Sequence, residues 1–161
     1  MNIEKPKDGQ ECVWDYPRPP LLVRSSRTVR VKFEGVQIAL SSTGYRVLET
    51  SHPPSWYIPL QDVCSEFLIA TRKTSFCEWK GTAKYWTIGV GQKSVENVAW
   101  SYESPNPRFV EIRGFLAFYP NVLECYVDEE RVKPQPGGFY GGWITSDVVG
   151  PFKGVPGSQG W

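Results

Sequence analysis

The sequence has few of the residues and motifs on which enzymes and metal proteins usually depend. Among its 161 residues there is one histidine, His52, so any imidazole acid–base chemistry or metal ligation must use that side chain. Its cysteines, Cys12, Cys64, Cys77 and Cys125, are widely spaced and form no C-x-x-C pair. Because zinc sites usually take their ligands in such close pairs, we expect no metal site, no cofactor and free thiols.

Phosphate-binding and catalytic signatures are also missing. The glycine-rich pieces 89–91 and 137–138 lack the Lys-Ser/Thr pair and the following helix of a phosphate-binding loop. No G-x-S-x-G elbow, paired-histidine motif or paired-carboxylate signature is present. The formal net charge of +1 gives the chain no overall attraction to phosphate backbones or anionic membranes. We therefore expect no nucleic-acid partner.

Long apolar runs are absent as well. No uninterrupted apolar stretch approaches the roughly 18 residues of a membrane span, and residues 1–11 lack the apolar core of a signal peptide. These absences predict a cytoplasmic protein without membrane contact. Aromatic residues, in contrast, are abundant, with Trp 7, Tyr 8 and Phe 8. Such residues favour pleated strands, and Trp and Tyr can also line a wet pocket.

The pattern of apolar residues predicts an all-β, antiparallel fold. Residues 29–33 alternate apolar and polar side chains, and the alternation resumes over 36–40 after a Glu34-Gly35 turn, which predicts a hairpin. Further strands are expected over 45–49, 64–70, 81–90, 98–102, 112–119 and 123–127, with a single helical turn over 60–63. Two consecutive prolines after His52 bar a helix and place it in a stiff, extended loop.

We predict three parts along the chain. Residues 1–26, rich in proline and charge, form an extended arm, and residues 27–133 form the β domain. Residues 134–161 combine glycine and proline with aromatic side chains, of which a flexible linker would hold few. Two interpretations of this last segment stay open. It is either a strap that packs on the domain or an exposed arm that docks a partner subunit, as in a homodimer.

Several polar residues are candidates to carry chemistry. His52 is the only candidate imidazole base, and the alternative is a structural hydrogen-bonding role. Cys77 is a candidate nucleophile because the nearby ammonium of Lys80 favours a thiolate, and the alternative is a small buried apolar residue. Lys80 itself is a candidate to hold an anionic or carbonyl group, or else a solvated surface lysine.

Aromatic residues form a further group, which can be either a core or the walls of a pocket for a flat or cationic ligand. The group consists of Trp56, Tyr57, Trp79, Tyr85, Trp86, Trp100 and Tyr102.

Five blocks of sequence occur in an order that resembles a known family. They are RVLETSHPP (46–54), YIPLQDV (57–63), CEWKGTAKYW (77–86), ENVAWSYESP (96–105) and IRGFLAFYP (112–120). Together they resemble the bacterial domain-of-unknown-function family 427, sometimes labelled nucleotidyltransferase-like, over roughly residues 28 to 132. The tail from Gln135 is similar to an extension in one branch of that family. The resemblance implies a compact two-sheet fold similar to the β-tent domains and brings no established reaction.

The nucleotidyltransferase label has no support in the residues, because the glycine-serine motif with spaced metal-binding aspartates is absent. Carried over residue by residue, the family's prominent positions fall on Glu49, His52, Tyr57, Asp62, Thr74, Cys77, Lys80, Tyr85, Trp86, Trp100 and Tyr102. Two departures stand out. Glu78 stands where a proline is common, and residues 43–45 replace a stretch that often holds an arginine.

The leading hypothesis is a small-ligand-binding β domain whose aromatic-walled pocket is oriented by His52 and Lys80. Its predicted ligand-binding residues are Glu49, His52, Tyr57, Thr74, Lys80, Tyr85, Trp86, Trp100 and Tyr102. One alternative is an enzyme, a hydrolase or thiol-dependent catalyst, with His52, Cys77 and Lys80 as the catalytic candidates. The other is an interaction module that works through the aromatic tail. The identity of the small molecule is open.

Overall fold

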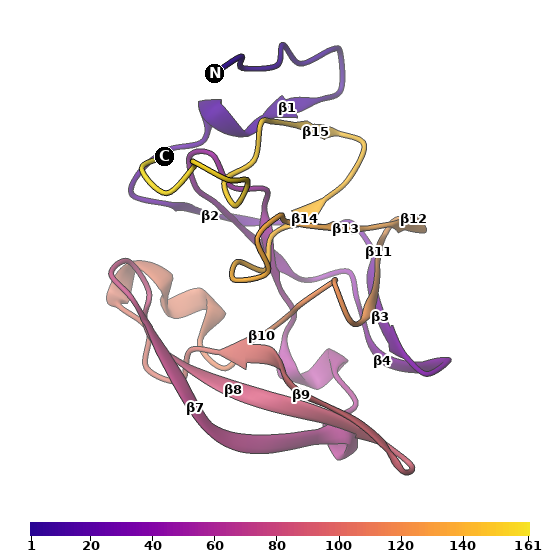
Figure 1. The fold of residues 1–161 in the computed structure, drawn as a ribbon. Helices are drawn as coiled ribbons and strands as arrows, with labels where there is room; N and C mark the ends of the chain where they lie inside the picture. Colours follow the sequence, from indigo (N-terminus) through magenta and orange to yellow (C-terminus); the bar gives the residue numbers. More distant parts are fainter.

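The computed structural model describes residues 1–161, and strands account for most of its regular structure (Figure 1). The helical elements are four short 3₁₀ turns, Val13–Asp15, Leu60–Asp62, Ser65–Phe67 and Pro107–Ile112. The prediction of an all-β fold is therefore confirmed, and the helical turn expected over 60–63 is present. None of the helical segments has the length and apolar character needed to cross a bilayer.

One four-stranded antiparallel sheet has the order β12-β11-β3-β4. Its strands are β3 (Val29–Phe33), β4 (Val36–Ser41), β11 (Glu124–Val127) and β12 (Glu130–Arg131). The predicted hairpin is β3–β4. Glu34 and Gly35 at its turn adopt φ values of 51° and 76°. A two-residue turn with both central φ values positive matches the right-handed twist of the flanking strands.

A second four-stranded antiparallel sheet has the order β10-β9-β8-β7. Its strands are β7 (Leu68–Cys77), β8 (Gly81–Val90), β9 (Lys93–Ser101) and β10 (Leu116–Phe118). The strand predicted over 81–90 coincides with β8. The strand predicted over 64–70 starts only at Leu68, because a 3₁₀ turn precedes it. Of residues 112–119, only Leu116–Phe118 form a strand, β10, at the sheet edge. The apolar residues of this stretch are divided between two apolar clusters.

A three-stranded sheet, with the order β2-β5-β6, brings the N-terminal segment into the fold. Its strands are β2 (Leu21–Arg24), β5 (Tyr45–Leu48) and β6 (Ser55–Tyr57). Regular structure therefore begins before Arg27, where the sequence pattern placed its start. The pattern missed β2 because this short strand is apolar without alternation and follows consecutive prolines, which are typical of loops.

Four two-residue strands connect the two terminal segments to the fold. β1 (Glu11–Cys12) runs parallel to β15 (Val148–Val149), and β13 (Lys133–Pro134) pairs antiparallel with β14 (Trp143–Ile144). In Figure 1 the first and last parts of the chain accordingly lie side by side.

Two apolar clusters position the functional site. The main cluster draws on both four-stranded sheets and includes Trp143, which is 1% exposed and donates its indole N–H to the Phe118 carbonyl at 2.9 Å. The second cluster joins β5 and β6 to β8 and β9. Its members are Val47, Tyr57, Ala83, Tyr85, Trp100, Tyr102, Phe109, Ile112 and Ala117. Several of these aromatic rings also line a cavity.

Candidate functional site

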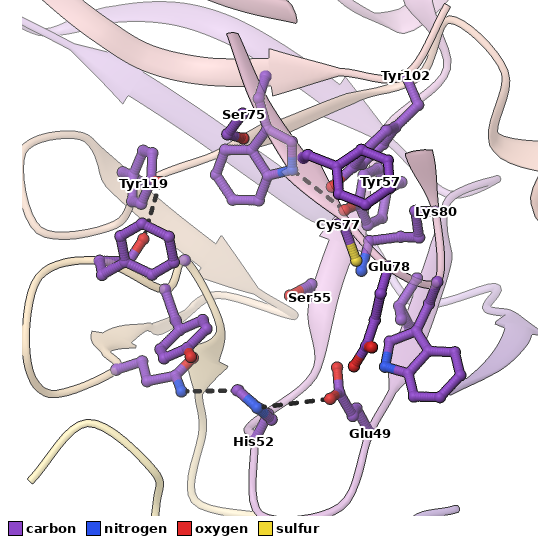
Figure 2. A pocket seen from close by; sticks show the side chains of 18 of the residues that line it. Glu49, His52, Ser55, Tyr57, Ser75, Cys77, Glu78, Lys80, Tyr102 and Tyr119 are labelled. Carbon is purple, nitrogen blue, oxygen red and sulfur yellow. Dashed lines mark hydrogen bonds and ion pairs between the residues drawn. The ribbon is translucent and has the colours of Figure 1, made fainter. Parts of the chain in front are cut away.

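A cavity of about 440 Å³ opens between the second apolar cluster and residues 135–141 of the C-terminal segment (Figure 2). Its other walls come from the β5–β6 loop, the β7–β8 turn and the facing side chains of β8 and β9. Eight of the residues predicted for the site line this cavity: Glu49, His52, Tyr57, Cys77, Lys80, Tyr85, Trp100 and Tyr102. The fold thus brings His52, Cys77 and Lys80 to one space.

Thr74 and Trp86 were also predicted as ligand-binding residues, and neither lines the cavity. Side chains alternate between the two faces of a strand. Since Tyr85 faces the cavity, Trp86 points to the opposite face, where Lys84 Nζ lies 4.4 Å from its ring centroid. Thr74 pairs with Lys84 in the ladder and is exposed. The prediction joined Tyr85 and Trp86, neighbouring residues of one strand whose side chains point to opposite faces of the sheet.

The wall formed by β8 and β9 is aromatic and internally hydrogen-bonded. Tyr85 and Trp100 are cross-strand neighbours. The Trp100 indole N–H donates to the Tyr57 hydroxyl at 3.1 Å, and the Tyr119 ring lies 4.7 Å from the Trp100 ring, centroid to centroid. The hydroxyls of Tyr85 and Ser75 share a hydrogen bond of 3.0 Å. Burial raises the pKa of Tyr57, so this phenol stays protonated and can donate.

Lys80 ends the turn between β7 and β8 and places its ammonium in the cavity (Figure 2), where the residue is 8% exposed. No carboxylate oxygen lies within 4.0 Å of its Nζ. The Nζ lies 5.8 Å from the centroid of the Tyr102 ring. Burial lowers the pKa of Lys80, but the combined electrostatic influence of the neighbouring Tyr57, Cys77 and Glu49 outweighs burial and raises the pKa above its ordinary value. The side chain is therefore a buried cation at neutral pH.

The loop that carries Glu49 and His52 is fixed by backbone contacts. The His52 N–H donates to the Glu49 carbonyl at 3.0 Å, and Ser51 adopts a φ of 71°, so the chain makes a tight turn before the two prolines extend it into β6. The Ser51 N–H donates to the Val13 carbonyl at 3.0 Å. This bond ties the loop to the N-terminal segment, and the two ionisable side chains gain a defined position at the cavity.

His52 is held by contacts around its ring. Its Nδ1 lies 3.0 Å from the Gln135 amide nitrogen, and its Nε2 lies 3.7 Å from a Glu49 carboxylate oxygen (Figure 2). The Tyr140 ring packs edge-on at a centroid distance of 4.7 Å. Burial, followed by the positive charge of Lys153, lowers the pKa of His52 to about 4. The imidazole is therefore neutral at physiological pH.

Cys77, the candidate nucleophile, is half-buried in the cavity wall, and its thiol lies beside the Lys80 side chain (Figure 2). All four thiols are free, and of these Cys12 and Cys125 are buried and Cys64 is exposed outside the cavity. No group of three or more His, Cys, Asp and Glu side chains is arranged to hold a metal ion. Cys77 is thus the one thiol that lines this cavity.

Several residues that the sequence pattern did not assign to the site also line the cavity, among them Ser55, Ser75, Tyr119, Gln135 and Tyr140. Ser55 and Ser75 stand two positions before Tyr57 and Cys77 on the same strands. The period of two along a strand would have found both of them. Gln135 and Tyr140 come from the segment beyond the predicted β domain, and no local signal in the sequence connects that segment to His52.

The fold and the cavity define a small all-β domain with an aromatic-walled site around a buried cation. Residues 21–132 match the sequence profile of the family described as "Domain of unknown function (DUF427)", and the chain belongs to this family. The match confirms the resemblance carried by the five sequence blocks. It ends before β13, so Gln135 and Tyr140 lie beyond the family domain. No curated protein matches the chain.

Proposed function

We propose that the chain binds a small anionic molecule with a flat, apolar or aromatic body. The observation that carries this proposal is Lys80, a buried ammonium that faces a cavity and has no carboxylate within 4.0 Å. Neighbouring groups hold this side chain as a cation without an ion pair, so the cavity presents a buried positive charge to a bound molecule. A carboxylate or similar anion on the ligand would complete the pair.

Two neutral groups near this cation also favour an acceptor on the ligand. The Tyr57 hydroxyl accepts the Trp100 N–H and also bonds to Tyr102, so the two phenols together can offer an O–H to a further partner. The Nε2 of His52 forms no hydrogen bond with the protein. Glu49 and Glu78 line the same cavity, and they suit a ligand that carries a hydrogen-bond donor in addition to its anion.

The dimensions of the cavity and its walls support a ligand of modest size. A volume of about 440 Å³ falls within the range of roughly 300–1,000 Å³ that is typical of small-molecule sites. The rings of Trp100, Tyr119 and Tyr140 can pack against a flat ligand. Phe76 and Phe139 also line the cavity and are 77% and 68% exposed, so a bound molecule would cover apolar surface that now faces water.

A thermal-shift screen tests the proposal. Benzoate and indole-3-carboxylate are compared with benzamide and indole-3-carboxamide, which keep the rings and remove the charge, while AMP and GMP extend the screen to nucleotides. We expect at least one of the anions to raise the Tm of the wild type, each carboxylate more than its amide, and Lys80→Met to remove the difference. If no anion raises the Tm, or if the variant responds like the wild type, the proposal is wrong.

A thiol-dependent enzyme is the second candidate, because Cys77 lies in the same cavity beside Lys80. Such an enzyme needs a thiolate at neutral pH or below. Iodoacetamide at mildly acidic pH would then alkylate Cys77 faster than Cys64, although Cys64 is the more exposed thiol. Alkylation of Cys77 at the same rate as Cys64, or more slowly, contradicts this candidate.

A further inference from the structure

We propose that Gln135 is a positioning residue that holds His52 in the neutral form with its proton on Nε2. In this form the imidazole offers the cavity a hydrogen-bond donor and no base. Gln135 lies beyond the family domain, is 4% exposed, and is separated from His52 by 83 positions in the sequence.

Three hydrogen bonds fix the orientation of the Gln135 amide. Its carbonyl oxygen accepts the Gly142 N–H at 3.1 Å, and its nitrogen donates to the Lys153 carbonyl at 2.9 Å. A backbone N–H only donates and a backbone carbonyl only accepts, so exchanging the amide oxygen and nitrogen would break both bonds. The remaining amide hydrogen is directed at Nδ1 of His52, 3.0 Å away.

This contact determines the tautomer of His52. Because the amide nitrogen can only donate, Nδ1 must be the unprotonated acceptor, and the neutral ring then carries its proton on Nε2. A second proton, on Nδ1, would place the ring N–H opposite the Gln135 amide N–H, so that two hydrogen-bond donors would face each other. Nε2 faces the Glu49 carboxylate at 3.7 Å, which is longer than a hydrogen bond. The Nε2–H is therefore available to a ligand atom in the cavity.

Three positive charges around the ring also favour its neutral form. The titratable groups that face it or act on it are Arg18, Glu49, Lys80, Tyr140 and Lys153. The three cations disfavour a second proton and, together with burial, lower the pKa of His52 to about 4. Glu49 is the one carboxylate in this group, and it favours a proton on Nε2 because it faces that nitrogen.

Gly142 allows the Gln135 amide to come this close. A Cβ at position 142 would lie 2.6 Å from the Gln135 carbonyl oxygen and 2.7 Å from the Pro53 carbonyl oxygen, closer than atoms can pack. The absent side chain thus leaves room for the amide between the C-terminal segment and the loop of His52.

Two consequences follow for the site. The first consequence rests on the proposed binding of an anion. The ligand then carries a hydrogen-bond acceptor opposite His52 in addition to its anionic group at Lys80. In addition, an imidazole with Nε2 protonated and Nδ1 occupied by an amide hydrogen has no free lone pair with which to deprotonate Cys77. The enzyme candidate would then have to rely on Lys80 alone to favour the thiolate.

Nitrogen NMR of the full chain tests the inference directly. Because His52 is the only histidine, the imidazole signals of protein labelled with ¹⁵N-histidine need no assignment. We expect an unprotonated Nδ1 and a protonated Nε2 from about pH 8 down to about pH 5.5, with titration only below that range. Gln135→Glu places a carboxylate, a hydrogen-bond acceptor, opposite Nδ1. It should raise the pKa of His52 by about one pH unit or more. Gln135→Met, without a donor, should increase the share of the tautomer that has its proton on Nδ1.

Gln61→Glu, the same change at an exposed position, is the control and should leave the signals of His52 unchanged. A wild type with Nδ1 protonated, or one that titrates near the ordinary value of about 6.5, overturns the inference. So does a folded Gln135→Met with wild-type signals. If neither Gln135 variant folds, the wild-type spectrum alone decides. The NMR measurement uses the protein without added ligand. A failure of carboxylates to bind would therefore not affect the inference about His52, and a different tautomer of His52 would not affect the proposed role of Lys80.

Discussion

Lys80 and Lys84 lie on opposite sides of the sheet formed by β7–β10. Lys80 reaches into the cavity, whereas Lys84 covers the Trp86 ring on the other face with its Nζ 4.4 Å from the ring centroid. The two side chains are chemically identical, so they differ only in their surroundings. Each is therefore a natural control for the other.

We expect Lys80→Met to change the free energy of unfolding of the ligand-free protein by less than about 2 kcal/mol. The substitution removes an ammonium that its neighbours favour but that no carboxylate pairs with, and it keeps most of the side-chain volume. Lys84→Met should lose roughly 0.5–1 kcal/mol, the usual contribution of a cation over an aromatic ring. Urea denaturation measures both. A loss above about 2 kcal/mol in Lys80→Met would show that neighbouring groups already satisfy the ammonium.

Gly141→Ala should disturb the aromatic wall. A Cβ at position 141 would lie 2.2 Å from the Trp100 ring, so the ring or the C-terminal segment must move. We expect a loss of about 1–3 kcal/mol in the free energy of unfolding and a change in the near-UV circular dichroism of the indoles. Gly160→Ala is the control, because nothing lies within 4 Å of its Cβ position. Equal stability of the two variants would contradict the packing of this segment on the cavity.

Trp143→Ala should cost about 3–5 kcal/mol, because this side chain is buried in the main cluster and its N–H bonds to the Phe118 carbonyl. Phe139→Ala, in the same segment, should change stability by less than about 0.5 kcal/mol, because Phe139 is 68% exposed. Thermal and urea unfolding distinguish these outcomes. A stable Trp143→Ala would mean that the segment serves a partner and contributes little to the core.

The lowered pKa of His52 predicts a dependence of stability on pH. In the native protein the pKa is about 4, against an ordinary value of 6.5, so the unfolded chain binds the extra proton between these values. Stability from this residue is therefore complete above about pH 6.5 and is lost as the pH falls toward 4, by up to about 3 kcal/mol. His52→Gln removes this term while the carboxylates titrate as before. Between pH 7 and pH 4.5, the free energy of unfolding of the variant should therefore change less than that of the wild type. An equal change in both proteins would contradict the lowered pKa of His52.

Local alternation predicted the strands that form ordinary hairpins. The β3–β4 hairpin and β8 follow directly from the period of two, as does the presence of Tyr85 and Trp100 on paired strands. The same rule also excludes Trp86 from the face of Tyr85, although the prediction placed both in the site. β2 was missed because its residues do not alternate and because its partner strand, β5, lies more than 20 residues later in the sequence.

The part of the site beyond the family domain had no local signal. Gln135 meets His52 only because β13 and β14 pair and the C-terminal segment returns across the β5–β6 loop. Such a contact depends on the tertiary path of the chain, whereas the blocks around Lys80 and Tyr57 were visible as aromatic and polar residues close together in sequence. The sequence therefore predicted the wall of the cavity that contains Lys80 and Tyr57, whereas the wall that contains Gln135 was found only in the structure.

A calorimetric titration at low salt tests the role of Lys80 most directly. Indole-3-carboxylate and indole-3-carboxamide are titrated into wild type, Lys80→Met and Lys84→Met. We expect the carboxylate to bind wild type and Lys84→Met alike and Lys80→Met at least about tenfold more weakly, as the loss of a charge-assisted hydrogen bond predicts. The carboxamide should bind all three equally weakly. Equal binding of the carboxylate to wild type and Lys80→Met, or of both ligands to the wild type, would contradict an anion site at Lys80.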